Sequence, residues 1–336
     1  MKTRGAFVLS ALLFVPGLHG QESSAPIIDV HFHSQGAASQ GPPPLGLCLP
    51  VDAWPTVETG TSWAAAFLAS QKEPGCSDPV WSPESDVELM ERSLEIAERW
   101  NVIGITSGAR LPEWLERAPD RIIPGIVFNG GPGSPSVDSL RARFVDGRIQ
   151  VFSEVTIQYQ GMEPGDPVFE PYLALAEELD IPVGIHIGTG PPGAPYLGFS
   201  GYRARLHSPL ILEEVLLRHP DLRLYVMHSG WPMLDDLLAL MWTHPQVYVG
   251  VGVISWGLPR TEFHRYLRRI VEAGFGRRIM FGSDQMVWPE ALEVAIHSIE
   301  TASFLSEGQK RDILYNNAAR FLRLSEEQIA KHHGTP

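Results

Sequence analysis

Eight short apolar segments, each followed by a segment with helical periodicity, constrain the fold of this chain most strongly. Their nearly continuous apolar character predicts strands that are buried on both faces. They are residues 27–33, 102–106, 122–128, 149–157, 182–187, 222–227, 247–253 and 278–281. Because buried strands that alternate with helices pair in parallel, eight such units predict an α/β fold, the (β/α)8 TIM barrel. A doubly wound open sheet is the alternative, but no Gly-x-Gly-x-x-Gly motif follows the first strand.

The 336 residues suit one barrel domain, which we expect over residues 27–324. A long connection at residues 34–83 follows the first strand. It is rich in Pro, Gly, Ser and Trp, and it is predicted to be a functional lid or a disordered loop. Cys48 and Cys76 both lie in it and would form a disulfide in an oxidising compartment, with two free thiols as the alternative. Residues 325–336 are expected to form a loose tail.

The N-terminus has the composition of an export signal. Lys2 and Arg4 precede an apolar run at residues 6–15, and a Pro-Gly pair and small residues follow it. The run is too short to cross a bilayer as a helix. Residues 1–20 are therefore predicted to be a signal peptide, and the mature protein is expected to be secreted or periplasmic, without membrane insertion after cleavage. The net charge of −13 argues against a nucleic-acid partner, because phosphates would be repelled.

Titratable side chains lie at the carboxyl ends of the predicted strands, where the active site of such a barrel is found. His31 and His33 share one face of the first strand, because side chains alternate along a strand, and can chelate one metal ion. The residues within or at the end of later strands are Glu154, His186, His228 and Asp284. A single histidine at a strand end is usually structural. Several histidines at equivalent ends of parallel strands favour a metal site.

Three motifs resemble the amidohydrolase superfamily. They are Ile-Asp-Val-His-Phe-His at 28–33, Ala-Glu-Glu-Leu-Asp-Ile-Pro-Val at 176–183 and Asn-Asn-Ala-Ala-Arg-Phe at 316–321. Together with the strand-end histidines, they are similar to the amidohydrolase-related branch. That branch contains metal-dependent hydrolases together with aminocarboxymuconate-semialdehyde decarboxylase and its relatives. The resemblance therefore implies a metal-dependent enzyme over about residues 27–324.

The resemblance also implies a role for each strand-end residue. One divalent ion would be held by His31, His33, His186 and Asp284. Three neutral imidazoles and a carboxylate suit Zn²⁺, with Mn²⁺ or Fe²⁺ as alternatives. His228 resembles the catalytic histidine that orients or deprotonates the water, with a ligand of a second metal or a wall residue as the alternative. Asp284 is a second proton acceptor. The carboxylated lysine of binuclear members has no counterpart here, so Glu154 is expected beside a ligand histidine or as a bridge.

Substrate contacts are expected from two loops. Arg203 and Arg205 lie in the glycine-rich loop after the fifth strand and could hold a substrate carboxylate, with simple solvation as the alternative. Trp256 follows the seventh strand and could pack on a planar or apolar substrate, with packing of a helix on the barrel as the alternative.

The expected function is hydrolysis of an ester, lactone or amide-like bond in a small molecule by a metal-bound hydroxide. Non-oxidative decarboxylation of a cyclic or unsaturated carboxylic acid is the first alternative. A barrel that binds its ligand without turnover is the second. The resemblance also allows a homodimer.

Overall fold

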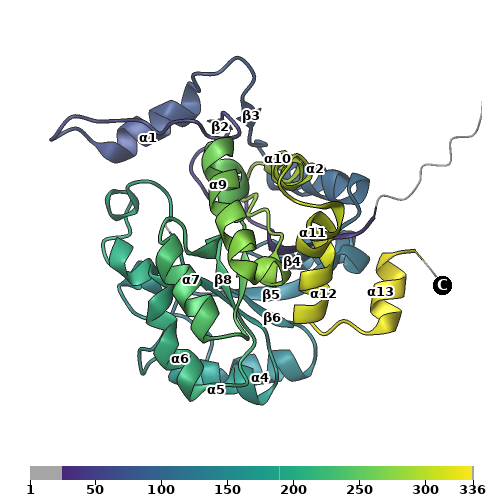
Figure 1. The fold of residues 1–336 in the computed structure, drawn as a ribbon. Coiled ribbons are helices and arrows are strands. Elements are labelled where there is room, and N and C mark those ends of the chain that lie inside the picture. The colour runs from purple at the N-terminus through teal and green to yellow at the C-terminus, as the bar shows by residue number, and fades with distance from the viewer. Residues whose placement is uncertain (1–24, 189, 335–336) are drawn as a thin grey trace, which may run out of the picture.

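Eight parallel strands form the centre of the structure, with helices on the outside (Figure 1). The computed structural model describes residues 25–188 and 190–334, so the predicted signal peptide lies outside the described residues. The strands lie side by side in chain order: β1 (Ile27–His33), β4 (Val102–Ser107), β5 (Ile122–Phe128), β6 (Val151–Val155), β7 (Val183–His186), β8 (Leu224–Met227), β9 (Tyr248–Gly250) and β10 (Ile279–Met280). Each predicted strand is present, and the predicted barrel is confirmed.

The barrel closes between β10 and β1 through single hydrogen bonds rather than a regular ladder. The backbone N–H of Val30 donates to the carbonyl of Phe281 at 3.0 Å. The carboxylate of Asp29, which is fully buried, accepts from the backbone N–H of Ser283 at 2.9 Å. This seam therefore places the end of the first strand beside the segment that follows the last one.

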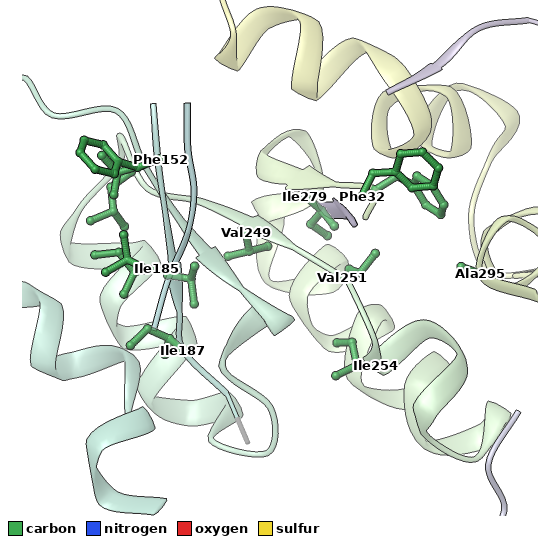
Figure 2. Packing of buried hydrophobic residues seen from close by; sticks show 14 of the residues in the cluster. Phe32, Phe152, Ile185, Ile187, Val249, Val251, Ile254, Ile279 and Ala295 are labelled. Carbon is green, nitrogen blue, oxygen red and sulfur yellow. The ribbon is translucent and has the colours of Figure 1, made fainter. Parts of the chain in front are cut away.

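The helices pack an apolar face on the strands, and α2 (Asp86–Arg99) shows why they form. Its buried residues recur at helical spacing, and the Ser85 side chain accepts from the N–H of Glu88 to cap the first turn. The other helices around the barrel are α3 (Leu111–Arg117), α4 (Val137–Val145), α5 (Glu170–Glu178), α6 (Glu213–Arg218), α7 (Leu234–Thr243), α8 (Ile254–Gly257), α9 (Arg260–Ile270), α10 (Ala291–Glu300), α11 (Glu307–Arg311) and α12 (Asn317–Phe321). Figure 2 shows part of the core, with Phe152 and Ile185 among its side chains. Within the described residues, no helix is long and apolar enough to cross a membrane.

The long connection after β1 folds into an arm that stands off the barrel (Figure 1). The arm contains α1 (Trp63–Lys72) and the short strands β2 (Gly46–Leu47) and β3 (Val80–Trp81). A disulfide joins Cys48 and Cys76 across it, as expected for an oxidising compartment. The indole N–H of Trp63 donates to the carbonyl of Pro192 at 2.7 Å, so the arm contacts the loop that follows β7.

The C-terminal segment corrects one expectation. The sequence predicts a loose tail at residues 325–336, but most of it forms α13 (Glu326–His332). The side chain of Ser325 accepts from the backbone N–H of Gln328, while the Gln328 side chain accepts from the backbone N–H of Ser325. This reciprocal pair is a capping box, which starts a helix by satisfying two free N–H groups.

Candidate metal centre

Six side chains with the chemistry of metal ligands meet at the carboxyl ends of the strands. They are His31, His33, Glu154, His186, His228 and Asp284. The side chain of Glu154 is 12% exposed, and the other five are at most 9% exposed. Burial of so many titratable groups is unfavourable unless they are paired or bind a metal.

His31, His33 and Asp284 form the first of two groups of donors. Oδ1 of Asp284 lies 2.9 Å from Nε2 of His33 and 3.5 Å from Nε2 of His31. The backbone holds Asp284 in place, because its N–H donates to the carbonyl of His31 across the barrel seam at 2.7 Å. Both ring nitrogens of His31 and Nδ1 of His33 lack a hydrogen-bond partner among the described residues. Buried polar atoms without partners are destabilising, so this group fits a bound cation.

Glu154, His186 and His228 form the second group. Oε1 of Glu154 lies 3.0 Å from Nδ1 of His186, and Nε2 of His228 lies 3.1 Å from the same nitrogen. Nδ1 of His228 lies 3.0 Å from the carbonyl oxygen of Gly252. Because a carbonyl only accepts, that nitrogen carries the proton and Nε2 presents a lone pair to the centre. The second group is therefore linked throughout by hydrogen bonds, whereas the first has one such contact, between His33 and Asp284, and three ring nitrogens without a partner among the described residues.

The carboxylate of Glu154 joins the two groups. Its Oε2 lies 3.8 Å from Nε2 of His31 and 3.9 Å from Nε2 of His33, while its Oε1 contacts His186. The sequence predicts His186 as the fourth ligand and Glu154 as its neighbour or as a bridge. In the structure the Glu154 carboxylate contacts His186 and lies near both histidines of the first group, so it has the predicted place beside a ligand histidine, and the role of His186 as the fourth ligand stays a prediction.

The charges around the first group favour a cation. Burial opposes a charge on His31, but the facing carboxylates of Asp284 and Glu154 outweigh it and raise the pKa of His31 to about 9. Burial also opposes charge on the two carboxylates, yet the neighbouring histidines hold the pKa of Asp284 and of Glu154 below their ordinary values. The centre therefore stabilises positive charge between these groups, which a divalent ion would supply.

Replacing Glu154 with Gln is expected to weaken metal binding by about 10- to 100-fold, the usual effect of removing a group that contacts a ligand histidine. The amide keeps the shape of the carboxylate but loses its charge. The measurement is competition with a chelating dye. Glu178→Gln is the control, because Glu178 is exposed on α5 and pairs with Arg141. Equal affinity of the Glu154 variant and the wild type would contradict a role for Glu154 at the ion.

Arg203, Arg205 and Trp256, the side chains expected to contact the substrate, differ in their burial. The Arg203 guanidinium donates to the carbonyls of Ser200 and Tyr202 in its own loop, and Arg205 is exposed. Trp256 is buried in α8, where its indole N–H donates to the carbonyl of Ser283 at 2.7 Å. The two arginines are exposed and the tryptophan is buried, and a contact between any of the three and the substrate stays a prediction.

Three rings for which the sequence predicts no role lie beside His186. They are Tyr159, Tyr202 and His207. The hydroxyl of Tyr159 lies 3.4 Å from Nε2 of His186. His207 is fully buried, with its ring centroid 5.7 Å from that of His186. Their positions after the fourth and fifth barrel strands were a usable signal, because such loops carry the active site, but no periodicity distinguishes these residues from their neighbours.

Residues 28–324 match the model of the protein family described as Amidohydrolase. This chain belongs to the amidohydrolase family. The resemblance inferred from the motifs is thus confirmed over nearly the whole barrel. The two groups of buried donors in this amidohydrolase agree with the metal-dependent catalysis of its family.

The amidohydrolase is also similar, at low identity, to individual proteins. It is 23% identical over 135 residues to Protein fluG of Emericella nidulans, a match that covers 36% of this chain and 16% of fluG. A probable 2-pyrone-4,6-dicarboxylic acid hydrolase of Acinetobacter baumannii shares 14% identity and a TM-score of 0.55, over 89% of this chain and 99% of that one. The 5-carboxyvanillate decarboxylase of Novosphingobium aromaticivorans, solved with manganese, shares 14% identity and a TM-score of 0.54. That match covers 91% of this chain and 98% of the decarboxylase. Both structures support the barrel fold.

Proposed function

We propose that this amidohydrolase is an exported hydrolase that cleaves an ester, lactone or amide bond of a small molecule with one divalent ion, Zn²⁺. The observation that carries the proposal is the asymmetry between the two groups of donors. The first group has unpartnered ring nitrogens beside a carboxylate, whereas the second is satisfied by its own hydrogen bonds. One ion therefore suffices to complete the centre. When bound, such an ion lowers the pKa of a coordinated water toward neutrality.

The side chains divide the remaining work between them. The first group would hold the ion, with His186 and Glu154 next to it as the further donors. Burial and the neighbouring His186 lower the pKa of His228 to about 3, so its ring is neutral near pH 7. Its Nε2 lone pair faces Nδ1 of His186 at 3.1 Å and would accept a proton from water once a water molecule replaces that contact.

Decarboxylation of a cyclic or unsaturated acid is the second candidate, and the fold shared with 5-carboxyvanillate decarboxylase favours it. A carboxylate substrate calls for a cationic side chain to hold it. Among the described residues, no arginine or lysine is hydrogen-bonded or ion-paired to the six donors. Hydrolysis of an uncharged bond has no such requirement, so we prefer it. The complete donor set also disfavours a barrel without turnover.

Export is supported by the disulfide between Cys48 and Cys76, because disulfides persist in oxidising compartments. A secreted or periplasmic location is part of the proposal, which the signal-like sequence of residues 1–20 also supports. A homodimer stays a prediction, which size-exclusion chromatography with light scattering tests.

Purified protein is expected to retain about one divalent ion per chain after dialysis, as a single-ion site implies. Elemental analysis identifies the ion, and a panel of lactones, esters and amides tests turnover. We expect hydrolysis that a chelator abolishes and the same ion restores. Release of CO₂ from aromatic or unsaturated acids, with no hydrolysis of the panel, would favour the decarboxylase. Full activity of metal-free protein would contradict both candidates.

A further inference from the structure

The side chain of Gln285 lies in the barrel seam, directly after Asp284 in the chain, and is fully buried. Its Oε1 accepts from the backbone N–H of His33 at 3.0 Å, and its Nε2 donates to the backbone carbonyl of the same residue at 2.6 Å. Buried backbone groups need such partners, which a neighbouring strand usually supplies. Here one side-chain amide satisfies both backbone groups of a candidate metal ligand.

Two consecutive residues therefore hold His33 from its two ends. Asp284 contacts Nε2 of the His33 ring at 2.9 Å, while Gln285 holds the backbone. Asp284 has a φ of 53°, a left-handed conformation that is uncommon for residues other than glycine. In this conformation its carboxylate and the amide of Gln285 both face the first strand. A shift of the His33 backbone would thus change the distance between its ring and the Asp284 carboxylate.

The imidazole of His33 has few other contacts that could orient it. A histidine that binds a metal usually donates its second ring N–H to a carboxylate or a carbonyl, which fixes the ring. His228 has a contact of this kind, because its Nδ1 lies 3.0 Å from the carbonyl oxygen of Gly252. Nδ1 of His33 has no hydrogen-bond partner among the described residues. The orientation of the His33 ring therefore depends on where its backbone is held.

The contact with His33 uses both functions of the Gln285 amide. A primary amide offers an acceptor oxygen and a donor nitrogen in one plane, so it can pair with the N–H and the carbonyl of one residue. An apolar side chain of the same length would leave both of these buried groups without a partner, which is unfavourable. Gln285 thus supplies what a longer last strand would otherwise provide.

We propose that Gln285 is a positioning residue of the metal centre, which holds the backbone of His33 so that the ring of His33 and the carboxylate of Asp284 meet at the ion. It acts through His33 and does not contact the ion itself. Functional constellations need their side chains held to within about 0.5 Å, so loss of this contact should weaken metal binding. The inference rests on the metal-binding part of the proposed function and not on which bond is cleaved.

The test measures the affinity of the folded protein for Zn²⁺ by competition with a chelating dye. Thermal unfolding first shows that each variant is folded. Gln285→Met keeps the length of the side chain but removes both hydrogen bonds, and it should weaken Zn²⁺ binding about tenfold or more, the usual effect of losing a group that orients a ligand. Gln285→Asn keeps an amide on a shorter side chain. It should bind Zn²⁺ less tightly than the wild type and more tightly than the Met variant.

Asn317→Leu is the matched control, because Asn317 on α12 is also a fully buried amide bonded to the backbone of the barrel. Its Nδ2 donates to the carbonyls of Gly276 and Ile279, at the start of β10. Loss of these bonds should lower the thermal stability of the protein and leave its affinity for Zn²⁺ unchanged. The comparison therefore separates positioning of a ligand from general damage to the barrel.

Each outcome bears on the inference. Wild-type affinity in the folded Gln285 variants would overturn it and leave the proposed function intact. An equal loss of affinity in the Asn317 variant would also overturn it, because any damage to the barrel would then weaken the centre. If the Gln285 variants bind Zn²⁺ more weakly as expected but the wild type hydrolyses no ester, lactone or amide, the proposed function fails and the inference stands. A wild type that binds no Zn²⁺ would contradict both.

Discussion

Replacing Asp284 with Asn is expected to remove both the bound metal and the catalytic activity. The amide keeps the size of the carboxylate but has no charge, so the imidazoles of His31 and His33 would face a cation without their nearest anionic partner. Because a catalytic ion supplies several kcal/mol of transition-state stabilisation, the loss of turnover should reach about a thousandfold or more.

Two measurements on the Asp284 variant check this expectation, namely metal content by elemental analysis and turnover on the best substrate of the panel. Asp312→Asn serves as the control, because that side chain accepts a hydrogen bond from Asn316 on the outer helices. The control should keep both properties. An Asp284 variant that retains its ion and its activity would show that the first group does not hold the catalytic metal.

His228→Asn is expected to lower turnover by about 10²- to 10⁴-fold, the usual contribution of a positioned general base, and to leave the metal in place. Asn can still donate to the carbonyl of Gly252, which His228 contacts through Nδ1. It cannot replace the Nε2 lone pair. Burial and His186 keep the imidazole of His228 neutral, and this variant removes that neutral proton acceptor.

The metal content of the His228 variant separates two roles. A full complement of ion with little turnover agrees with a proton acceptor. Loss of the ion would make His228 a ligand, in line with its place in the second group of donors. His264→Asn changes a histidine outside the centre and should alter neither property.

The barrel was predictable because its signals are repeated and local. Each strand is a short apolar run between turn residues, and eight of them in alternation with helices leave few parallel architectures. The donors were predictable for a related reason. A residue at the end of a barrel strand has its position fixed by the strand, so His186, His228 and Asp284 could be placed beside His31 before any contact was known.

The burial or exposure of single side chains in the loops depended on tertiary contacts, which cannot be read from a single sequence. Arg203 and His207 lie in one loop, and the structure exposes the first and buries the second. Trp256 lies in a four-residue helix whose residues are all buried, which is too short for a periodicity to show. The helix at 326–332 was predictable in principle, because Ser325 and Gln328 have the spacing of a capping box.

The first donor group lies at the junction of the first and last barrel strands, and this position determines when during folding its set of metal ligands becomes complete. His31 and His33 belong to the first strand, and Asp284 follows the last, so almost the entire barrel is synthesised between them. Contacts between such distant parts of a chain form late, because the whole intervening chain must be ordered first. A partly folded chain, or one truncated before Asp284, therefore presents an incomplete set of ligands. Capture of the metal can then report that the barrel has closed.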